Sequence, residues 1–278
     1  MRTSYVEEIL TWRKNADEAI RRENSWLALA GLFWLEQGVN PVGSDQESVV
    51  RLPNSAPGRI GEIKLEGNTA SFRSAYPEIR ANGETVREVV LQPDTSGDPT
   101  RVTLKDLTFI LIERYGQSGV RLWDNGREQR RSFPTRSWYP IAEKYRLSGR
   151  FDPYPAAKST QMVDISGVLR EGTVDGMVTF QLGNRTFTLE ASKSEDQELF
   201  IMFADLSNGK ETYPPGRYLV AELDDDGNVN LDFNKAYNPP CAFTDYATCL
   251  FAPEQNRLAV PIEAGELYAG KTGLNENI

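Results

Sequence analysis

The last third of the sequence contains several side chains of the types that proteins use to hold small polar ligands. Asp205, Asp232 and Glu254 could act as an acid or a base if burial raised the pKa of a carboxyl group. Arg217 and Arg257 could clamp a carboxylate or a phosphate through paired hydrogen bonds. The pattern indicates a site for a small polar or anionic molecule, without assigning a catalytic residue. The candidate ligand-binding residues are Asp205, Tyr213, Arg217, Asp232, Asn234, Tyr237, Asn238, Cys241, Glu254 and Arg257.

The same residue types also have a structural interpretation, and the sequence leaves both open. Asp205 and Asp232 can cap turns, arginines can bond loop carbonyls, and tyrosine hydroxyls can fix a loop in place, since buried polar groups usually satisfy the backbone. Two functions follow. One is ligand binding in a pocket under the C-terminal loop, with hydrolytic activity as an extension. The alternative is a non-enzymatic scaffold or interaction module, with a homodimer formed through the N-terminal helix.

Cys241 and Cys249 are the two cysteines of the chain. Eight residues apart on a bent loop, they could come within disulfide distance. A reactive thiol needs a lowered pKa, and the sequence offers no histidine to lower it. We therefore expect two small buried thiols, with a redox disulfide as the second interpretation.

The absence of histidine excludes several chemistries. Ser-His-Asp and Cys-His hydrolases need the imidazole as a base, and two cysteines cannot complete a zinc site. The segment Asp224–Asn230 alternates carboxylates and amides as a calcium loop does, but its glycine is misplaced and Lys235 stands where a glutamate should be. It is predicted to be a hairpin turn. Without a phosphate-cradling glycine motif for a flavin, we expect neither metal nor cofactor.

The net charge of −9 argues against nucleic acid and anionic membranes as partners, because both require an excess of Lys and Arg. The densest basic stretch, Arg127 to Arg136, is interpreted as a solvated loop between strands. The first residues lack the apolar region of a signal peptide, and the chain lacks an apolar run of about 18 residues. We expect a cytoplasmic protein.

Local patterns predict the elements that must position these residues. Ser4 and Glu7 form a capping box, and apolar residues at helical spacing follow, so an amphipathic N-terminal helix is expected within residues 1–24. The apolar run Leu27 to Leu35 favours a buried strand. Turn pairs such as Asn82-Gly83 and Gly183-Asn184 then recur between short alternating segments, which is typical of β-hairpins.

The fold class predicted is mainly β: a single-domain β-barrel or β-sandwich over residues 1–278, with the N-terminal helix and a long C-terminal loop. The β core is expected at 25–231. A loop rich in Pro, Asn and Cys, with a last strand, is expected at 232–266, followed by a tail at 267–278. Pro239-Pro240 disfavours helix and ladder pairing there.

The run from Asp232-Phe233-Asn234-Lys235 through Pro239-Pro240-Cys241 to Thr244 resembles the family catalogued as domain of unknown function 1684. Further matching motifs are Asn208-Gly209-Lys210, Gly216-Arg217, Glu254-Gln255-Asn256-Arg257 and Ala264-Gly265-Glu266. Upstream similarities, including Gly31-Leu32-Phe33-Trp34, extend the likeness over nearly the whole chain. Asp245 and Leu250-Phe251 depart from the family pattern, which has prolines there. The resemblance implies a largely β domain and supplies no mechanism.

Overall fold

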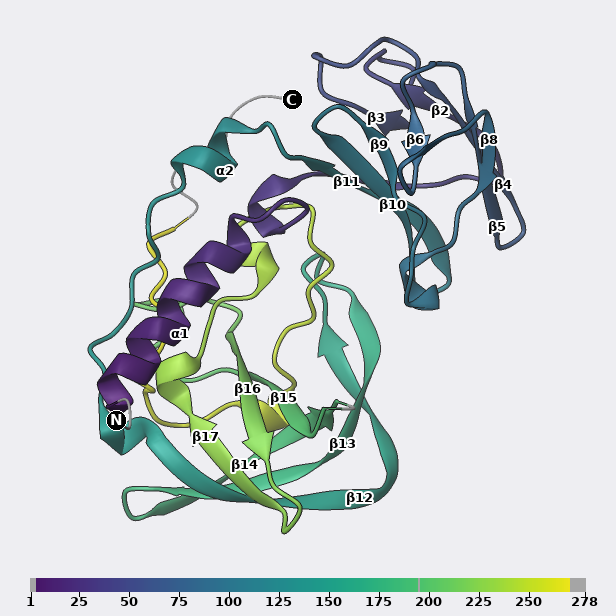
Figure 1. The fold of residues 1–278 in the computed structure, drawn as a ribbon. Helices are drawn as coiled ribbons and strands as arrows, with labels where there is room; N and C mark the ends of the chain where they lie inside the picture. Colours follow the sequence, from purple (N-terminus) through teal and green to yellow (C-terminus); the bar gives the residue numbers. More distant parts are fainter. Residues whose placement is uncertain (1–3, 195, 271–278) are drawn as a thin grey trace. The chain divides into compact units, whose positions relative to one another are not determined.

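The computed structural model describes residues 4–194 and 196–270, which divide into two compact units. The first contains 4–19, 134–243 and 248–270, and the second contains 20–133 and 244–247. Strands dominate both units, so the mainly-β prediction is confirmed (Figure 1). The single domain predicted over 1–278 stays a prediction, and the units are considered separately.

The first unit is built on a closed barrel of six antiparallel strands (Figure 1). The predicted turn at Gly183-Asn184 joins the second barrel strand to the third, and the turn at Asp224–Asn228 joins the last two. Both turns carry glycines at positive φ, 63° at Gly183 and 84° at Gly227. The strands are Arg146–Val163 (β12), Leu169–Leu182 (β13), Arg185–Lys193 (β14), Glu198–Phe203 (β15), Arg217–Leu223 (β16) and Asn228–Asp232 (β17).

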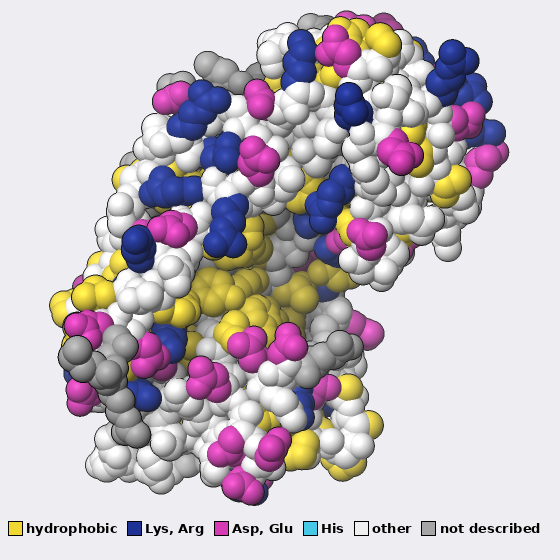
Figure 2. All heavy atoms as spheres, viewed as in Figure 1, with side chains coloured by type: hydrophobic (Ala, Val, Ile, Leu, Met, Phe, Trp, Pro, Cys, Tyr) yellow, Lys and Arg dark blue, Asp and Glu magenta, His cyan; other side chains and the backbone are white. Residues whose placement is uncertain are grey.

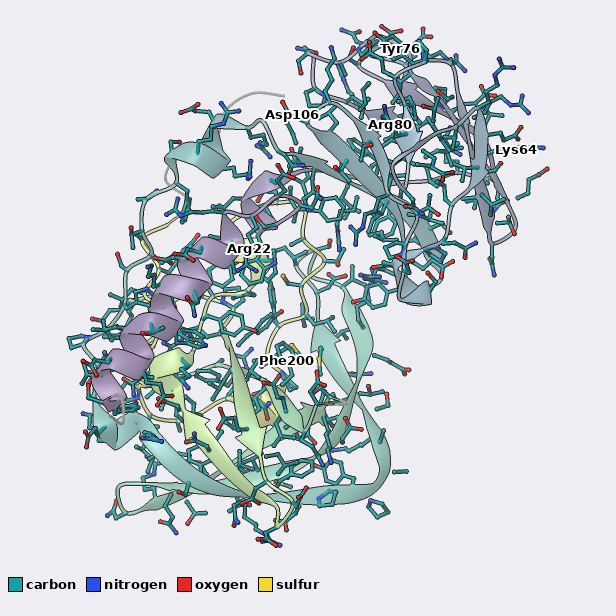
Figure 3. The ribbon with its side chains drawn as sticks, in the orientation of Figure 1. Arg22, Lys64, Tyr76, Arg80, Asp106 and Phe200 are labelled. Carbon is teal, nitrogen blue, oxygen red and sulfur yellow. The ribbon has the colours of Figure 1, made fainter. Side chains whose placement is uncertain are left out.

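Side chains fill the inside of the barrel. Leu199, Ile201 and Phe203 point inward from β15 and are fully buried, whereas Phe200 lies on the outer side of the same strand (Figure 3). About eight strands are needed before a barrel can enclose even one small ligand. A ligand of this barrel would therefore bind at its end or on its outside.

The N-terminal helix α1 (Tyr5–Ile20) lies along the barrel unit (Figure 1). The predicted capping box is present, because the backbone N of Ser4 donates to Glu7 Oε2 at 2.8 Å and the N of Glu7 donates to Ser4 Oγ at 3.3 Å. The helix ends before the predicted limit at residue 24, since turn residues with Asn24 at a φ of 55° follow Ile20. Residues 1–3 of the predicted segment lie outside the described residues.

The second unit contains a six-stranded sheet, in the order β1-β11-β10-β9-β6-β7, and a five-stranded sheet, in the order β3-β2-β4-β5-β8. Apolar residues of both sheets, among them Phe72 and Phe109, share one core. The strand predicted from the apolar run Leu27 to Leu35 is confirmed, and it is β1 of this unit. The bounds are Leu29–Trp34 (β1), Gly38–Gly43 (β2), Val50–Arg51 (β3), Gly61–Glu66 (β4), Thr69–Ser74 (β5), Arg80–Ala81 (β6), Glu84–Thr85 (β7), Glu88–Val90 (β8), Val102–Leu104 (β9), Leu107–Arg114 (β10), Gln117–Asp124 (β11) and, for a short helix, Glu128–Ser132 (α2).

The last strand predicted within 232–266 is wrong. Between residues 233 and 270 the described chain forms only short 3-10 helices and isolated bridges, such as Ala204 with Arg257. The 3-10 helices are Phe233–Lys235 (η4), Pro240–Ala242 (η5) and Glu254–Asn256 (η6). Prolines before or within the latter two lack the N–H that a ladder requires. Of the predicted tail, 271–278 lies outside the described residues.

Candidate functional site

Asp205 and Arg217 form a buried ion pair that closes the loop between β15 and β16. Arg217 Nη2 donates to Asp205 Oδ2 at 2.9 Å, and both side chains are fully buried. The guanidinium also donates to the carbonyls of Ile262, at 2.9 Å, and Ala264. Asp205 Oδ1 accepts the backbone N–H groups of Ser207 at 2.8 Å and Ile262 at 3.0 Å. These groups bind the protein's own backbone, so the pair stabilises the packing of residues 262–264.

Asp232 and Asn234 hold the helix α1 against the end of β17. The Tyr5 hydroxyl lies 3.0 Å from both Asp232 carboxylate oxygens and accepts from Asn234 Nδ2 at 2.9 Å. Asn234 also pairs with both backbone groups of Ala142, each at 3.0 Å. Burial, followed by the charge of Asp232, raises the pKa of the Tyr5 phenol. These two candidates therefore make helix-docking contacts.

Asn238 belongs to a third buried network, centred on Glu266. Glu266 Oε2 accepts the backbone N of Asn238 at 2.8 Å and Arg136 Nη1 at 3.2 Å, and Arg136 Nε donates to Asp17 at 2.6 Å. Burial raises the pKa of Glu266 to about 7, although Arg136 opposes the rise. The solvated loop predicted for the basic stretch is wrong at Arg136, which is buried because two carboxylates neutralise its charge.

The remaining candidates divide between a buried thiol cluster and the surface. Cys241 contacts the Tyr213 hydroxyl, and burial is the main cause of the raised pKa of that phenol. Tyr237 pairs with the backbone of Tyr218, and burial raises the pKa of Tyr237 to about 12. Glu254 and Arg257 form an ion pair of 3.1 Å with side chains 86% and 55% exposed. The ten candidates therefore belong to several separate groups of contacts and do not converge on one site.

Asn256, which is not among the ten predicted candidates, joins two weakly paired barrel strands. In the part of the chain that the structure describes, β14 and β15 pair at Ser192–Phe200 and Lys193–Leu199. Beyond that point Asn256 Oδ1 accepts the N–H of Glu190 at 2.7 Å, and its Nδ2 donates to the carbonyls of Glu190 and Met202, each at 2.8 Å. The C-terminal loop therefore completes the barrel wall. The sequence around one asparagine does not predict that its side chain will bond two distant strands.

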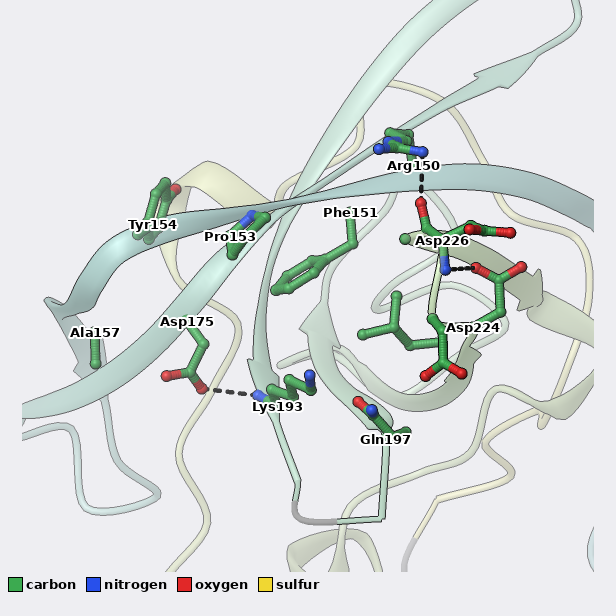
Figure 4. Close-up of a pocket in the computed structure, with 13 residues that line it drawn as sticks. Arg150, Phe151, Pro153, Tyr154, Ala157, Asp175, Lys193, Gln197, Asp224 and Asp226 are labelled. Carbon is green, nitrogen blue, oxygen red and sulfur yellow. Dashed lines mark hydrogen bonds between the residues drawn. The ribbon is translucent and has the colours of Figure 1, made fainter.

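A pocket of about 500 Å³ lies at the barrel end formed by β12, the β14–β15 turn and the β16–β17 turn (Figure 4). The Phe151 ring forms an apolar part of the pocket wall and packs against Gly176. A Cβ atom at residue 176 would lie 2.5 Å from this ring, so a larger residue would not fit there. None of the ten candidate residues lines this pocket. Its charged lining residues are Arg150, Asp175, Lys193, Asp224, Asp225 and Asp226.

Several of these charges already have partners within the protein. Arg150 Nη1 donates to the carbonyl of Asp226 at 2.7 Å, and the backbone N of Lys193 donates to Asp175 Oδ2 at 2.8 Å. Asp224 accepts three hydrogen bonds from Asp226 and Asn228, and the contacts with Asn228 are the main cause of its lowered pKa. The turn predicted at Asp224–Asn230 is confirmed. Acidic side chains on the lower part of Figure 2 mark this end of the barrel.

Tyr154, in the same pocket wall, is anchored on a buried carboxylate. Its hydroxyl donates to Glu190 Oε1 at 3.1 Å, and Lys158 Nζ donates to the same oxygen at 2.8 Å. Burial and this contact raise the pKa of the phenol. Glu190 Oε2 is buried without a hydrogen-bond partner among the described residues. The anchored ring presents a fixed aromatic wall to the pocket.

Within 4–194 and 196–270, no three Cys, Asp or Glu side chains are grouped so that they could hold a metal ion. In the same part of the chain, no helix is long and apolar enough to cross a membrane.

The model of the family described as protein of unknown function (DUF1684) matches residues 131–267, which span the barrel and the C-terminal loop. The solution structure of the uncharacterized protein from gene locus rrnAC0354 of Haloarcula marismortui is 30% identical, covers 50% of this chain and 80% of that chain, and has a TM-score of 0.42. The FhaA FHA domain complexed with the intracellular domain of Rv3910 is 22% identical over 32% of this chain and 85% of that chain, with a TM-score of 0.24. No curated protein matches. The chain belongs to the DUF1684 family.

Proposed function

We propose that the barrel unit binds a small, positively charged polar molecule, such as an organic amine, in the pocket at the end of the barrel. The observation that carries the proposal is the charge of the walls, where four aspartates face one arginine and one lysine. An excess of carboxylates favours a cation and disfavours an anion, which is one of the two ligand classes, polar or anionic, indicated by the sequence.

The size and surface of the pocket support a small occupant. Ligand sites usually measure roughly 300–1,000 Å³ and combine apolar walls with a few polar groups. This pocket of about 500 Å³ has Phe151 and Tyr154 beside the charged groups. The Tyr154 ring, held by Glu190, adds aromatic surface beside these groups, and Lys158 Nζ already lies over the ring, 5.6 Å from its centre. Asp225 and Asp226 lie on an exposed turn, where their carboxylates can reach an incoming amine.

The carboxylates of the pocket and of the buried ion pair do not support a hydrolytic activity. A general acid near neutral pH needs a raised pKa, whereas the hydrogen bonds of Asp224 lower its pKa. The buried pair Asp205–Arg217 is closed by its own backbone contacts. Binding without chemistry needs only the charge and shape of the pocket.

Calorimetric titration of the full chain with a diamine, an amino acid, a neutral sugar and a dicarboxylate would test the proposal at low salt. We expect the diamine to bind and the dicarboxylate to give no heat. The double variant Asp225→Asn, Asp226→Asn should weaken diamine binding by about tenfold, on the order of 1.4 kcal/mol. Asp98→Asn with Glu84→Gln removes the same charge from exposed positions of the second unit and should leave binding unchanged. Equal weakening by both double variants would contradict the proposal, as would the absence of diamine binding at millimolar concentration.

The alternative function, a non-enzymatic scaffold that forms homodimers, has one supporting observation. Most of the candidate residues in the C-terminal loop make contacts within the chain, which is what a structural role requires. Light scattering during gel filtration tests the dimer, and a monomer at every concentration would count against it. A cytoplasmic location is likewise a proposal, supported by the two cysteines being thiols and not a disulfide.

A further inference from the structure

Cys241 and Cys249 lie in contact in the first unit, although the chain between them leaves that unit. Residues 244–247 belong to the second unit, where Tyr246 packs against an apolar cluster. The backbone N of Cys241 donates to Sγ of Cys249 at 3.3 Å, and the two thiol groups are in hydrogen-bonding contact. In the described structure both residues are thiols and not a disulfide.

Separate backbone contacts fix each cysteine. Cys241 lies in η5, which is closed by the N–H of Ala242 donating to the Pro239 carbonyl at 2.9 Å. The carbonyl of Cys249 accepts the N–H of Ile165 at 3.0 Å, next to the turn that joins β12 to β13. The two sulfur atoms therefore meet because two independently anchored segments bring them together. Such preorganisation lowers the entropy lost when a bond forms between them.

We propose that Cys241 and Cys249 are an oxidation site that closes to a reversible intramolecular disulfide when a hydroperoxide oxidises it. Cys249, which is 7% exposed, is oxidised first, because Cys241 is 0% exposed and a hydroperoxide reaches it less easily. The Cys249 thiolate bonds to one peroxide oxygen, the O–O bond breaks, and the leaving oxygen takes a proton to become an alcohol or water. The product at Cys249 is a sulfenic acid.

The second step joins the two sulfur atoms. The Cys241 sulfur bonds to the Cys249 sulfur, the S–O bond breaks, and the departing hydroxide takes the Cys241 proton and leaves as water. In total the two thiols lose two electrons and two protons, and the hydroperoxide is reduced to an alcohol and water. A small dithiol restores the reduced pair by exchange.

The environment of Cys249 sets the rate of the first step. Its contact with Cys241, together with burial, raises the pKa of the Cys249 thiol, so little thiolate exists at neutral pH. Oxidation is therefore slow and base-dependent, and its rate rises about tenfold per pH unit between pH 6 and 8. The disulfide closes the loop 242–248, which includes residues 244–247 of the second unit.

The sequence makes the oxidation simple to measure. The chain has two cysteines, and trypsin releases both in one peptide, Ala236–Arg257, because no Lys or Arg lies between them. The folded full chain is treated with excess hydrogen peroxide at pH 8 and then denatured in the presence of N-ethylmaleimide, which alkylates remaining thiols. After trypsin digestion, the mass of the peptide is measured by mass spectrometry. We expect the peptide to lose two hydrogens and take no maleimide, and to return to the dithiol with dithiothreitol.

A second measurement isolates the contribution of the fold. Equilibration in mixtures of reduced and oxidised glutathione gives the equilibrium constant of the disulfide, whatever the route of its formation. We expect this constant to be at least about tenfold larger in the folded chain than in urea, since the fold preorganises the sulfurs. The variant Cys241→Ser should give sulfinic acid or a mixed disulfide at Cys249. The proposal is overturned by a folded chain that keeps two alkylatable thiols, by oxidation to sulfinic acid or to a dimer, or by equal constants with and without urea.

Discussion

Arg217 and Arg257 are two arginines of one candidate set, yet their replacement by alanine should affect stability very differently. Arg217 is fully buried against Asp205 and donates to the carbonyls of Ile262 and Ala264. Arg257 has a side chain 55% exposed and forms an ion pair with Glu254 alone among the described residues. A ligand site that used both arginines would lose affinity with either variant, whereas a structural role affects folding at Arg217 alone.

The contacts set the expected magnitudes. Arg217→Ala leaves the Asp205 carboxylate buried without its counterion, which costs about 3–5 kcal/mol. For a chain of this size that loss corresponds to roughly a 10 °C fall in Tm. Arg257→Ala removes an exposed i,i+3 pair, whose contribution is about 0.3 kcal/mol. Its Tm should stay within about 1 °C of the parent chain.

Urea unfolding curves of the full chain, followed by circular dichroism, would measure both variants. A double-mutant cycle with Asp205→Ala tests the pair itself: the double variant should be less destabilised than the sum of the single variants by 1 kcal/mol or more, on the order expected for contacting residues. A loss below about 1 kcal/mol in Arg217→Ala, or additive effects in the cycle, would refute a structural role for the pair.

Two further substitutions test the other buried networks. Glu266 has its pKa raised from 4.5 to about 7, so its stabilising contribution is complete below pH 4.5 and is lost as pH rises through 7, by about 3 kcal/mol. Tm against pH should therefore fall less steeply between pH 5 and 8 in Glu266→Gln, and parallel curves would contradict this. Asn256→Ala should cost about 2–3 kcal/mol, because it leaves backbone groups of Glu190 and Met202 unpaired. Gln255→Ala, at an exposed neighbouring position, should stay within about 0.5 kcal/mol in the same urea titration.

Sequence reasoning succeeded where local chemistry decides the structure. Asn82 and Gly83 both adopt positive φ, 49° and 86°, which is why this pair predicts a tight hairpin turn. The capping box of Ser4 and Glu7 likewise depends on residues three positions apart. Each of these features can be read from a few neighbouring residues, because its energy comes from them.

The division into a barrel and a pair of sheets depends on contacts that no local pattern contains. The barrel closes where Arg146 pairs with Asp232, 86 residues later in the chain. Its β14–β15 edge is completed by Asn256, which follows β15 by more than fifty residues. Alternating segments predict strands equally well in either architecture. The partners of each strand, and hence the number of sheets, come from register and closure over long separations.

The candidate site shows why a polar motif is an ambiguous signal of function. Residues 233–266 contain no strand in the described chain, so their backbone groups depend on side chains for hydrogen bonds. Asp205 supplies such a bond to the N–H of Ile262, Arg217 supplies one to the carbonyl of Ala264, and Glu266 accepts the N–H of Asn238. A loop of this length needs acidic and basic side chains to fold, whether or not it binds a ligand. The barrel-end pocket instead includes turn residues, and their sequence predicts only a turn. The polar motif therefore indicates a ligand site where the structure has internal contacts, and no motif indicates the pocket.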